Sequence, residues 1–84
     1  MQAPNTLGRL RTLLADQFGR APSLVTQDAT LRGTLMLDSL DLEDLAFFVQ
    51  REFRVSIEPE FYRRARSLEG LVRRIESGRP LSSA

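Results

Sequence analysis

Apolar residues recur at helical spacing in three separate segments of the chain. The first segment places leucines and a phenylalanine three or four residues apart, at Leu7, Leu10, Leu14 and Phe18. Side chains at these intervals lie on one face of a helix, so the pattern predicts a first helix with one buried face. Asn5 or Thr6 can cap its start, and Gly19 is suited to end it.

A second helix is predicted from about Ser39 to Phe53. Its buried face would carry Leu42, Leu45, Ala46, Val49 and Phe53. A last helix is predicted after Ser67, which can cap it, and before Gly78 and Pro80, which favour its end. The apolar positions of this helix are Leu68, Leu71, Val72 and Ile75.

Two shorter segments connect these helices. Pro59 suits the first turn of a helix and predicts a short one in "PEFYRRA". The preceding "FRVSIE" alternates like a strand, but no partner strand is visible, so we interpret it as a connector that fills the core. Residues 19–37 form a long loop whose apolar residues should pack on the core. These are Leu24, Val25, Leu31, Leu35 and Leu37.

Amphipathic helices must bury their apolar faces against one another. The predicted fold is therefore all-α, a small four-helix bundle with a short third helix and a long loop between helices one and two. One domain is expected at residues 5–78, with flexible ends at 1–4 and 79–84. Long packed loops in small domains are often functional.

Composition excludes several kinds of active site. The 84 residues contain no cysteine and no histidine. A disulfide, a thiolate site, a Ser-His-Asp hydrolase and a self-sufficient zinc enzyme are thereby excluded, and no metal site is expected. No apolar run is long enough to span a bilayer, and the N-terminus lacks a signal-peptide pattern. We expect a cytoplasmic monomer without a membrane span.

The net charge of +1 hides three differently charged segments. Residues 1–37 carry +2, residues 38–60 carry −5 and residues 61–84 carry +4. Such runs are usually solvated faces, but an acidic middle and a basic end also suggest two different surfaces.

The start of the second helix raises a question about Ser39. If Ser39 were the cap, Leu42 would stand three residues on and could not reach back. If Asp38 is the cap, Asp41 stands there instead and completes a capping box with a short acidic side chain. The second assignment is better, and it leaves the Ser39 hydroxyl free beside the long loop.

Leu40 and Phe47 fall on nearly the opposite side of this helix from its buried face. The short third helix or the loop could cover them. Alternatively, they form a partner-docking face, with two apolar contacts in an acidic rim next to an exposed serine.

The stretch "LDSLDLEDL", followed by "EFRVSIEPE", resembles the acyl carrier proteins. Their hallmark is Asp-Ser-Leu at the start of the second helix of a four-helix bundle. The resemblance covers about residues 6–77 and includes "DATL" before the motif and the Phe–x–Val–x–Ile exit from the second helix.

This resemblance implies that Ser39 is esterified by a 4′-phosphopantetheine arm taken from coenzyme A. A separate phosphopantetheinyl transferase, with magnesium, attaches the arm, which then holds acyl groups as thioesters for acyl-loading and acyl-transferring enzymes. The chain itself is then a carrier and not an enzyme. Asp38 is implied to position the loop and helix start. The family's recognition helix corresponds to Leu40, Asp41, Glu43, Asp44 and Phe47.

The sequence departs from the family pattern at several positions. Met36 stands where glycine is usual and Thr34 where an acid is common. The third helix, usually acidic, carries Arg63, Arg64 and Arg66, of which the first two are candidate partner contacts. These departures favour a dedicated carrier with few partners, in fatty-acid, lipid or polyketide-type biosynthesis.

Three alternatives stay open from the sequence. A peptidyl or aminoacyl carrier usually has Gly-Gly-His/Asp-Ser, which is absent. An unmodified helical protein-interaction module would have the same fold with an incidental Ser39. A nucleic-acid binder using the C-terminal arginines lacks the usual charge footprint, so we expect no nucleic-acid partner.

Overall fold

The computed structural model describes residues 5–78. Its elements are α1 (Thr6–Phe18), the 3-10 turn η1 (Pro22–Leu24), α2 (Ser39–Phe53), α3 (Pro59–Arg64) and α4 (Leu68–Ser77). No β-strand occurs within these residues. The predicted all-α bundle, with its short third helix and long loop, is confirmed. The ends predicted to be flexible, residues 1–4 and 79–84, lie outside the described residues.

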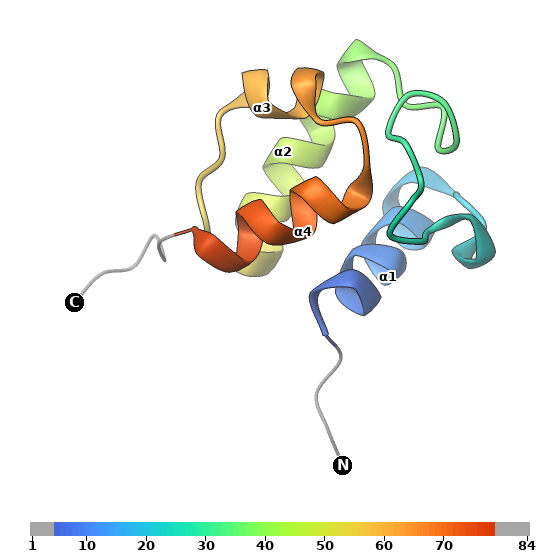
Figure 1. The fold of residues 1–84 in the computed structure, drawn as a ribbon, viewed down its shortest axis with the longest axis horizontal. Coiled ribbons are helices and arrows are strands. Elements are labelled where there is room, and N and C mark those ends of the chain that lie inside the picture. The colour runs from blue at the N-terminus through green and yellow to red at the C-terminus, as the bar shows by residue number, and fades with distance from the viewer. Residues whose placement is uncertain (1–4, 79–84) are drawn as a thin grey trace.

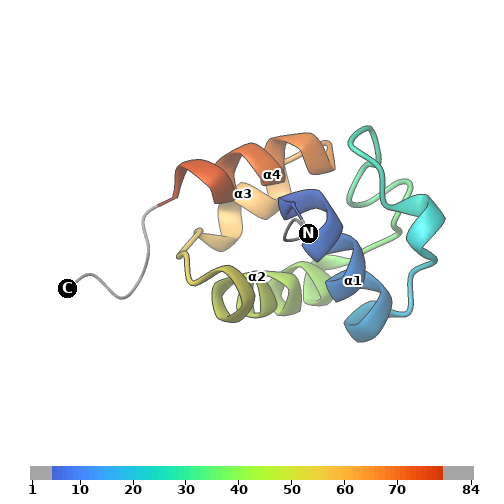
Figure 2. The ribbon, with the colours of Figure 1, turned by 90° about the horizontal axis from the view of Figure 1, so that it is seen from below.

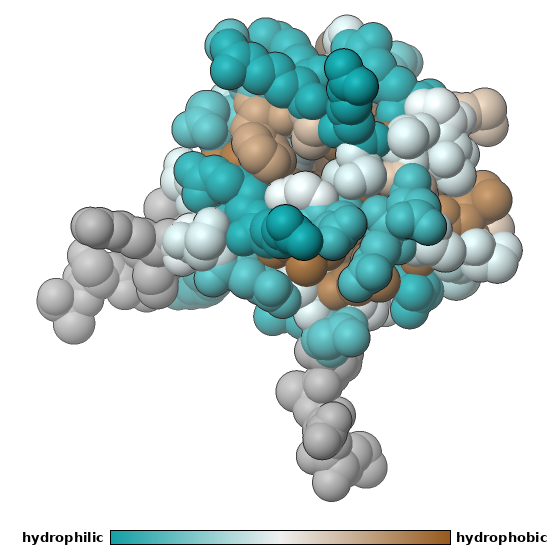
Figure 3. All heavy atoms as spheres, viewed as in Figure 1, coloured by the Kyte–Doolittle hydropathy of each residue, from teal (hydrophilic) through white to brown (hydrophobic). Residues whose placement is uncertain are grey.

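Helix α4 lies in front of α2 in Figure 1, and Figure 2 shows these two helices on opposite sides of the bundle. Helix α3 packs against α2, and α1 packs against α4. Both views show the long loop between α1 and α2 at one side of the molecule, next to the end of α1 and the start of α2 (Figures 1 and 2). The face seen in Figure 3 is largely hydrophilic, with hydrophobic residues visible between the polar ones. The apolar faces of the helices are therefore directed inward, as their spacing predicts.

Helix α1 begins and ends as its sequence predicts. The Asn5 side chain accepts a hydrogen bond of 2.7 Å from the Gly8 N–H. At the other end Gly19 adopts the left-handed conformation, with φ of 66°, which glycine tolerates without a steric cost. Leu10 and Leu14 are completely buried, while Leu7 and Phe18 at the ends of the stripe are partly buried.

The long loop packs on the core, as predicted, except at one position. Its buried residues are Val25, Ala29, Leu31, Leu35 and Leu37. Leu24 is 39% exposed, so the prediction is wrong there. Leu24 belongs to the η1 turn, none of whose residues is buried, whereas Val25 directly after the turn is buried.

Helix α4 is capped by this loop and not by the predicted serine. Ser67 occupies the N-cap position, but its side chain makes no capping hydrogen bond. The free N–H groups of Leu68 and Glu69 instead donate to the carbonyls of Ala29 and Gln27, at 2.8 and 3.1 Å. The carbonyls of a buried loop need hydrogen-bond donors, and the first N–H groups of a helix need acceptors. Here the two sets of groups satisfy each other.

The segment between α2 and α3 is a connector, as predicted. Val55 and Ile57 are buried, and Arg54 ends α2 in the left-handed conformation with φ of 58°. Pro59 then begins α3.

Within residues 5–78, the Tyr62 hydroxyl is the one buried polar side-chain group that has no hydrogen-bond partner. The side chain is 1% exposed, and its hydroxyl makes no hydrogen bond. Burial raises the pKa of Tyr62 above its ordinary value of 10.0, because the phenolate would lose its hydration. The folded protein therefore holds this tyrosine neutral at a pH where an unfolded chain ionises it.

We predict that Tyr62→Phe raises the free energy of unfolding by about 1 kcal/mol at pH 7, because the buried hydroxyl has no partner to lose. In the parent protein, stability should fall as pH rises above about 10, where only the unfolded tyrosine ionises, with a slope approaching about 1.4 kcal/mol per pH unit. The chain contains no lysine, no cysteine and one tyrosine, so no other side chain titrates in that window. Urea unfolding at pH 7 to 11.5 measures both effects. Equal slopes in the variant and the parent would contradict the assignment.

Candidate functional site

Asp38 and Asp41 form a reciprocal capping box at the start of α2. The Asp38 carboxylate accepts a 2.8 Å hydrogen bond from the Asp41 N–H, and the Asp41 carboxylate accepts one of 3.1 Å from the Asp38 N–H. The predicted assignment of the cap to Asp38 is confirmed. Ser39 is the first residue of the helix, it is exposed, and its hydroxyl takes no part in capping.

Arg32 lies beside the Ser39 hydroxyl, and the sequence pattern did not predict this contact. Its Nη2 is 3.5 Å from Ser39 Oγ, and both side chains are exposed. The two residues come from an irregular loop and a helix start, so no periodicity predicts the contact. A guanidinium and the positive end of the α2 dipole both favour a negatively charged group at this hydroxyl.

Two apolar side chains on the outer face of α2 are uncovered. Leu40 is 71% exposed and Phe47 is 57% exposed, so neither α3 nor the loop covers them. Met36, just before the motif, is 68% exposed and adds a third apolar side chain close to Ser39 in the chain. In the sequence, Met36 is notable only because it stands where glycine is usual, and nothing there predicts its exposure.

The three acidic residues in the first two turns of α2 divide into two groups. Glu43 and Asp44 are exposed, and within the described residues neither makes an ion pair. Asp41 is half-buried, because it closes the capping box and lies 3.9 Å from the Arg20 guanidinium. The structure thus makes Asp41 part of the framework around Ser39, while Glu43 and Asp44 face solvent.

The arginines of α3 are only partly neutralised by their neighbours. Arg64 lies 3.7 Å from Glu60, and both side chains are exposed. Arg63, and Arg66 just after the helix, make no ion pair with another described residue. The nearby Glu58 and Glu69 pair instead with Arg74 and Arg73 of α4, at 3.8 and 3.0 Å. The short helix therefore keeps a basic surface.

The backbone just before Ser39 is unusual at two positions. Met36 has φ of 52°, a left-handed conformation that a side chain disfavours. Gly33 has no room for a side chain, because an added Cβ would lie 2.5 Å from Thr30 Oγ1. This close approach lets the Thr34 N–H donate to Thr30 Oγ1 at 2.8 Å, which tightens the turn.

One cleft of about 540 Å³ lies between α1 and α2 but does not include Ser39. Its lining is mostly polar and charged: Arg9, Thr12, Leu13, Asp16, Gln17, Phe48, Arg51 and Glu52. No group of acidic side chains within residues 5–78 is arranged to hold a metal ion. None of the described helices is both long and apolar enough to cross a membrane.

A small helical bundle with a free hydroxyl at the start of its second helix has the architecture of a carrier domain. Residues 8–75 match the family described as the phosphopantetheine attachment site. The chain is 31% identical over 77 residues to acyl carrier protein 2 of Ralstonia nicotianae, covering 92% of this chain and 95% of that protein. It is 29% identical over 73 residues to an acyl carrier protein of Cylindrotheca sp., covering 87% and 91%.

The chain therefore belongs to the acyl carrier protein family, and its cofactor is 4′-phosphopantetheine. The chemistry at the start of α2 fits this group. A phosphodiester needs an accessible hydroxyl and tolerates or prefers nearby positive charge, and Ser39 with Arg32 and the helix N-terminus offers both.

We predict that Met36→Gly raises the free energy of unfolding by up to about 1 kcal/mol. Glycine adopts φ of 52° without the steric cost of a side chain, and part of this gain is lost to the greater freedom of glycine in the unfolded chain. Met36→Ala is the matched control, because it removes the exposed side chain but keeps the Cβ. Thermal and urea unfolding of both variants measures the difference. Equal changes in the two variants would contradict a backbone origin.

Proposed function

We propose that Ser39 carries the 4′-phosphopantetheine arm and that the protein holds acyl groups as thioesters at the end of this arm. The observation that carries the proposal is the capping box. Asp38 and Asp41 satisfy the start of α2 between themselves and leave an exposed Ser39 hydroxyl that takes no part in capping. Ser39 also lies inside the segment that matches the family.

Attachment of the arm would form a bond between Ser39 Oγ and a phosphorus atom of coenzyme A and break the phosphoanhydride bond at that phosphorus. The leaving group is the nucleotide part of coenzyme A, and the hydroxyl proton passes to a base. Because this chain has no histidine, we assign that base to the phosphopantetheinyl transferase. When bound, the arm supplies the thiol that this cysteine-free chain lacks.

Arg32 would hold the phosphodiester end of the arm, and Asp38 would position the serine that carries it. Arg32 offers a guanidinium at 3.5 Å from Ser39 Oγ, which can pair with the phosphate charge. Asp38 acts on the other side by fixing the first turn of α2 through its 2.8 Å hydrogen bond. Asp38 is thus a positioning residue in this proposal, and it supports the hydroxyl without touching it.

The proposed partner surface comprises the outer face of α2 and the basic side of α3. Its residues are Leu40, Asp41, Glu43, Asp44, Phe47, Arg63 and Arg64. The exposed Leu40 and Phe47 supply apolar contact, while Glu43 and Asp44 steer encounter with basic enzymes. Asp41 contributes through its place in the capping box, because that role already occupies its carboxylate.

The mixed charge of this surface favours a dedicated carrier in fatty-acid, lipid or polyketide-type biosynthesis. An enzyme built for a uniformly acidic carrier would meet repulsion from Arg63 and Arg66, which have no acidic partner among the described residues. Loaded chains are proposed to fold back along Leu42, Val49 and Ile57, all of which are buried, or to stay outside where the cargo is short or polar. The cytoplasmic location and the monomeric state stay predictions.

We predict that Ser39→Ala abolishes gain of the arm while the free energy of unfolding stays within about 1 kcal/mol of the parent, because Asp38 carries the cap. Intact mass after incubation with coenzyme A, magnesium and a promiscuous phosphopantetheinyl transferase measures the first effect. The matched control is Ser23→Ala in the exposed η1 turn, which should load normally. Addition of the arm to the Ser39→Ala protein would refute the proposed site, and no addition to the parent would favour an unmodified interaction module.

We predict that reversing Arg63, Arg64 and Arg66 to Glu improves turnover with a ketoacyl synthase of bulk fatty-acid synthesis. Like charges facing each other across an interface can cost several kcal/mol, so their removal should raise kcat/KM about tenfold or more. Arg73→Glu is the control, because this exposed arginine lies on α4, outside the proposed surface. Equal kcat/KM for the parent and the reversed protein would show that the arginines form only a solvated face.

A further inference from the structure

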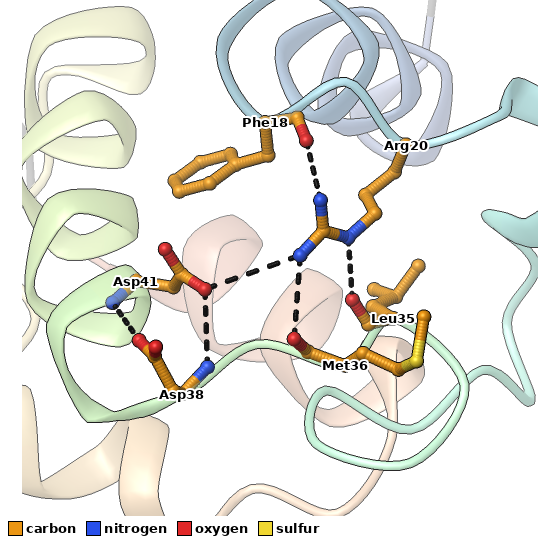
Figure 4. A network of polar contacts seen from close by, with 6 residues as sticks. All are labelled: Phe18, Arg20, Leu35, Met36, Asp38 and Asp41. Carbon is orange, nitrogen blue, oxygen red and sulfur yellow. Dashed lines mark hydrogen bonds and ion pairs between the residues drawn. The ribbon is translucent and has the colours of Figure 1, made fainter.

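One guanidinium connects the end of α1, the long loop and the start of α2. Arg20 donates from Nε to the Leu35 carbonyl at 2.6 Å and from Nη2 to the Met36 carbonyl at 3.3 Å. Its Nη1 donates to the Phe18 carbonyl, and its Nη2 lies 3.9 Å from Asp41 Oδ2. Figure 4 shows the guanidinium in the space between these groups. Its side chain is only 25% exposed.

The loop carbonyls that Arg20 holds come directly before the motif. Leu35 and Met36 precede Asp38 by three and two residues, and Met36 is in the left-handed conformation. The neighbouring amides of Leu35 and Leu37 donate back to the carbonyls of Thr30 and Leu31, both at 3.0 Å. Backbone hydrogen bonds therefore close the inner side of this strained turn, and Arg20 binds the carbonyls on its outer side.

The same guanidinium also reaches the residue that completes the α2 cap. Asp41 accepts from the Asp38 N–H and faces Arg20 with the same oxygen, Oδ2. Ser39 lies between Asp38 and Asp41 in the first turn of the helix. The backbone entering Ser39 and the cap around it are thus both tied to Arg20.

We propose that Arg20 is a positioning residue for attachment of the arm to Ser39. This inference rests on the proposed function. Arg20 keeps the segment from Leu35 to Asp41 in the single arrangement that the transferase binds. Without it the segment samples other arrangements, and the apparent affinity falls by the fraction of molecules that remain competent. The maximal rate is retained, because saturating transferase draws the chain back into the competent form.

The geometry requires arginine and not merely positive charge. Three carbonyls and a carboxylate lie around one planar group, and each nitrogen of the guanidinium has an assigned acceptor. A lysine ammonium keeps the charge but cannot span these positions at once. Arg20→Lys therefore separates anchoring of the loop from electrostatic attraction of the transferase.

The test compares Arg20→Lys and Arg20→Gln with the parent protein in transferase kinetics. Both variants should raise the KM for the carrier about threefold to tenfold and leave kcat within about twofold. Arg11→Gln is the matched control. Arg11 lies on α1 and, like Arg20, donates to a loop carbonyl, that of Val25, at 3.0 and 3.2 Å, but it does not contact the segment before Ser39. Its KM should stay at the parent value.

Amide hydrogen exchange supplies a readout without the transferase or the arm. In Arg20→Lys, exchange at Leu35, Leu37 and Asp41 should accelerate about tenfold, while the core of α2 keeps its protection. A parent KM in Arg20→Lys, or an equal KM increase in Arg11→Gln, overturns the inference and leaves the proposed function intact. Failure of the parent protein to gain the arm at Ser39 overturns both.

Discussion

The long loop between α1 and α2 can be buried only if its backbone polar groups find partners inside the protein. Its apolar side chains cover one end of the core, so its carbonyls are drawn away from water. Arginines of α1 and of the turn after it satisfy some of them, Arg11 at Val25 and Arg20 at Leu35 and Met36. The first N–H groups of α4 satisfy others, at Gln27 and Ala29. The loop therefore fixes α1, α2 and α4 to one another while it closes the core.

The same requirement at the start of α2 explains why a serine is available for chemistry there. A helix start needs acceptors for its free N–H groups, and serine is one of the usual residues to supply them. Here two aspartates meet that need reciprocally. The Ser39 hydroxyl between them is therefore not needed for capping. The guanidinium of Arg20 connects this first turn of α2 to the loop that precedes it.

Features set by neighbours in the sequence could be predicted, and features set by distant contacts could not. The bounds of α2, the Asp38–Asp41 box and the ends of α1 follow from spacings of three or four residues, and all are present. Ser67 has the residue type of a cap but loses this role to carbonyls some 40 residues earlier in the chain. Arg20 and Arg32 act across an irregular loop, where no period relates an arginine to its acceptor. The exposure of Leu40 and Phe47 depended on where α3 lies, which helical spacing leaves undetermined.

A carrier without histidine or cysteine offers its partners its shape, its apolar surface and its charge. The apolar residues of α2 lie on two different sides of the helix. The inner side closes the core with Leu42, Leu45 and Val49, and the outer side leaves Leu40 and Phe47 in water. Exposed apolar side chains contribute nothing to a core that is already closed, and for this reason we include Leu40 and Phe47 in the proposed partner surface. In that proposal the basic charge of the adjacent α3 selects among enzymes, because repulsion between like charges discriminates between partners that offer equal apolar contact.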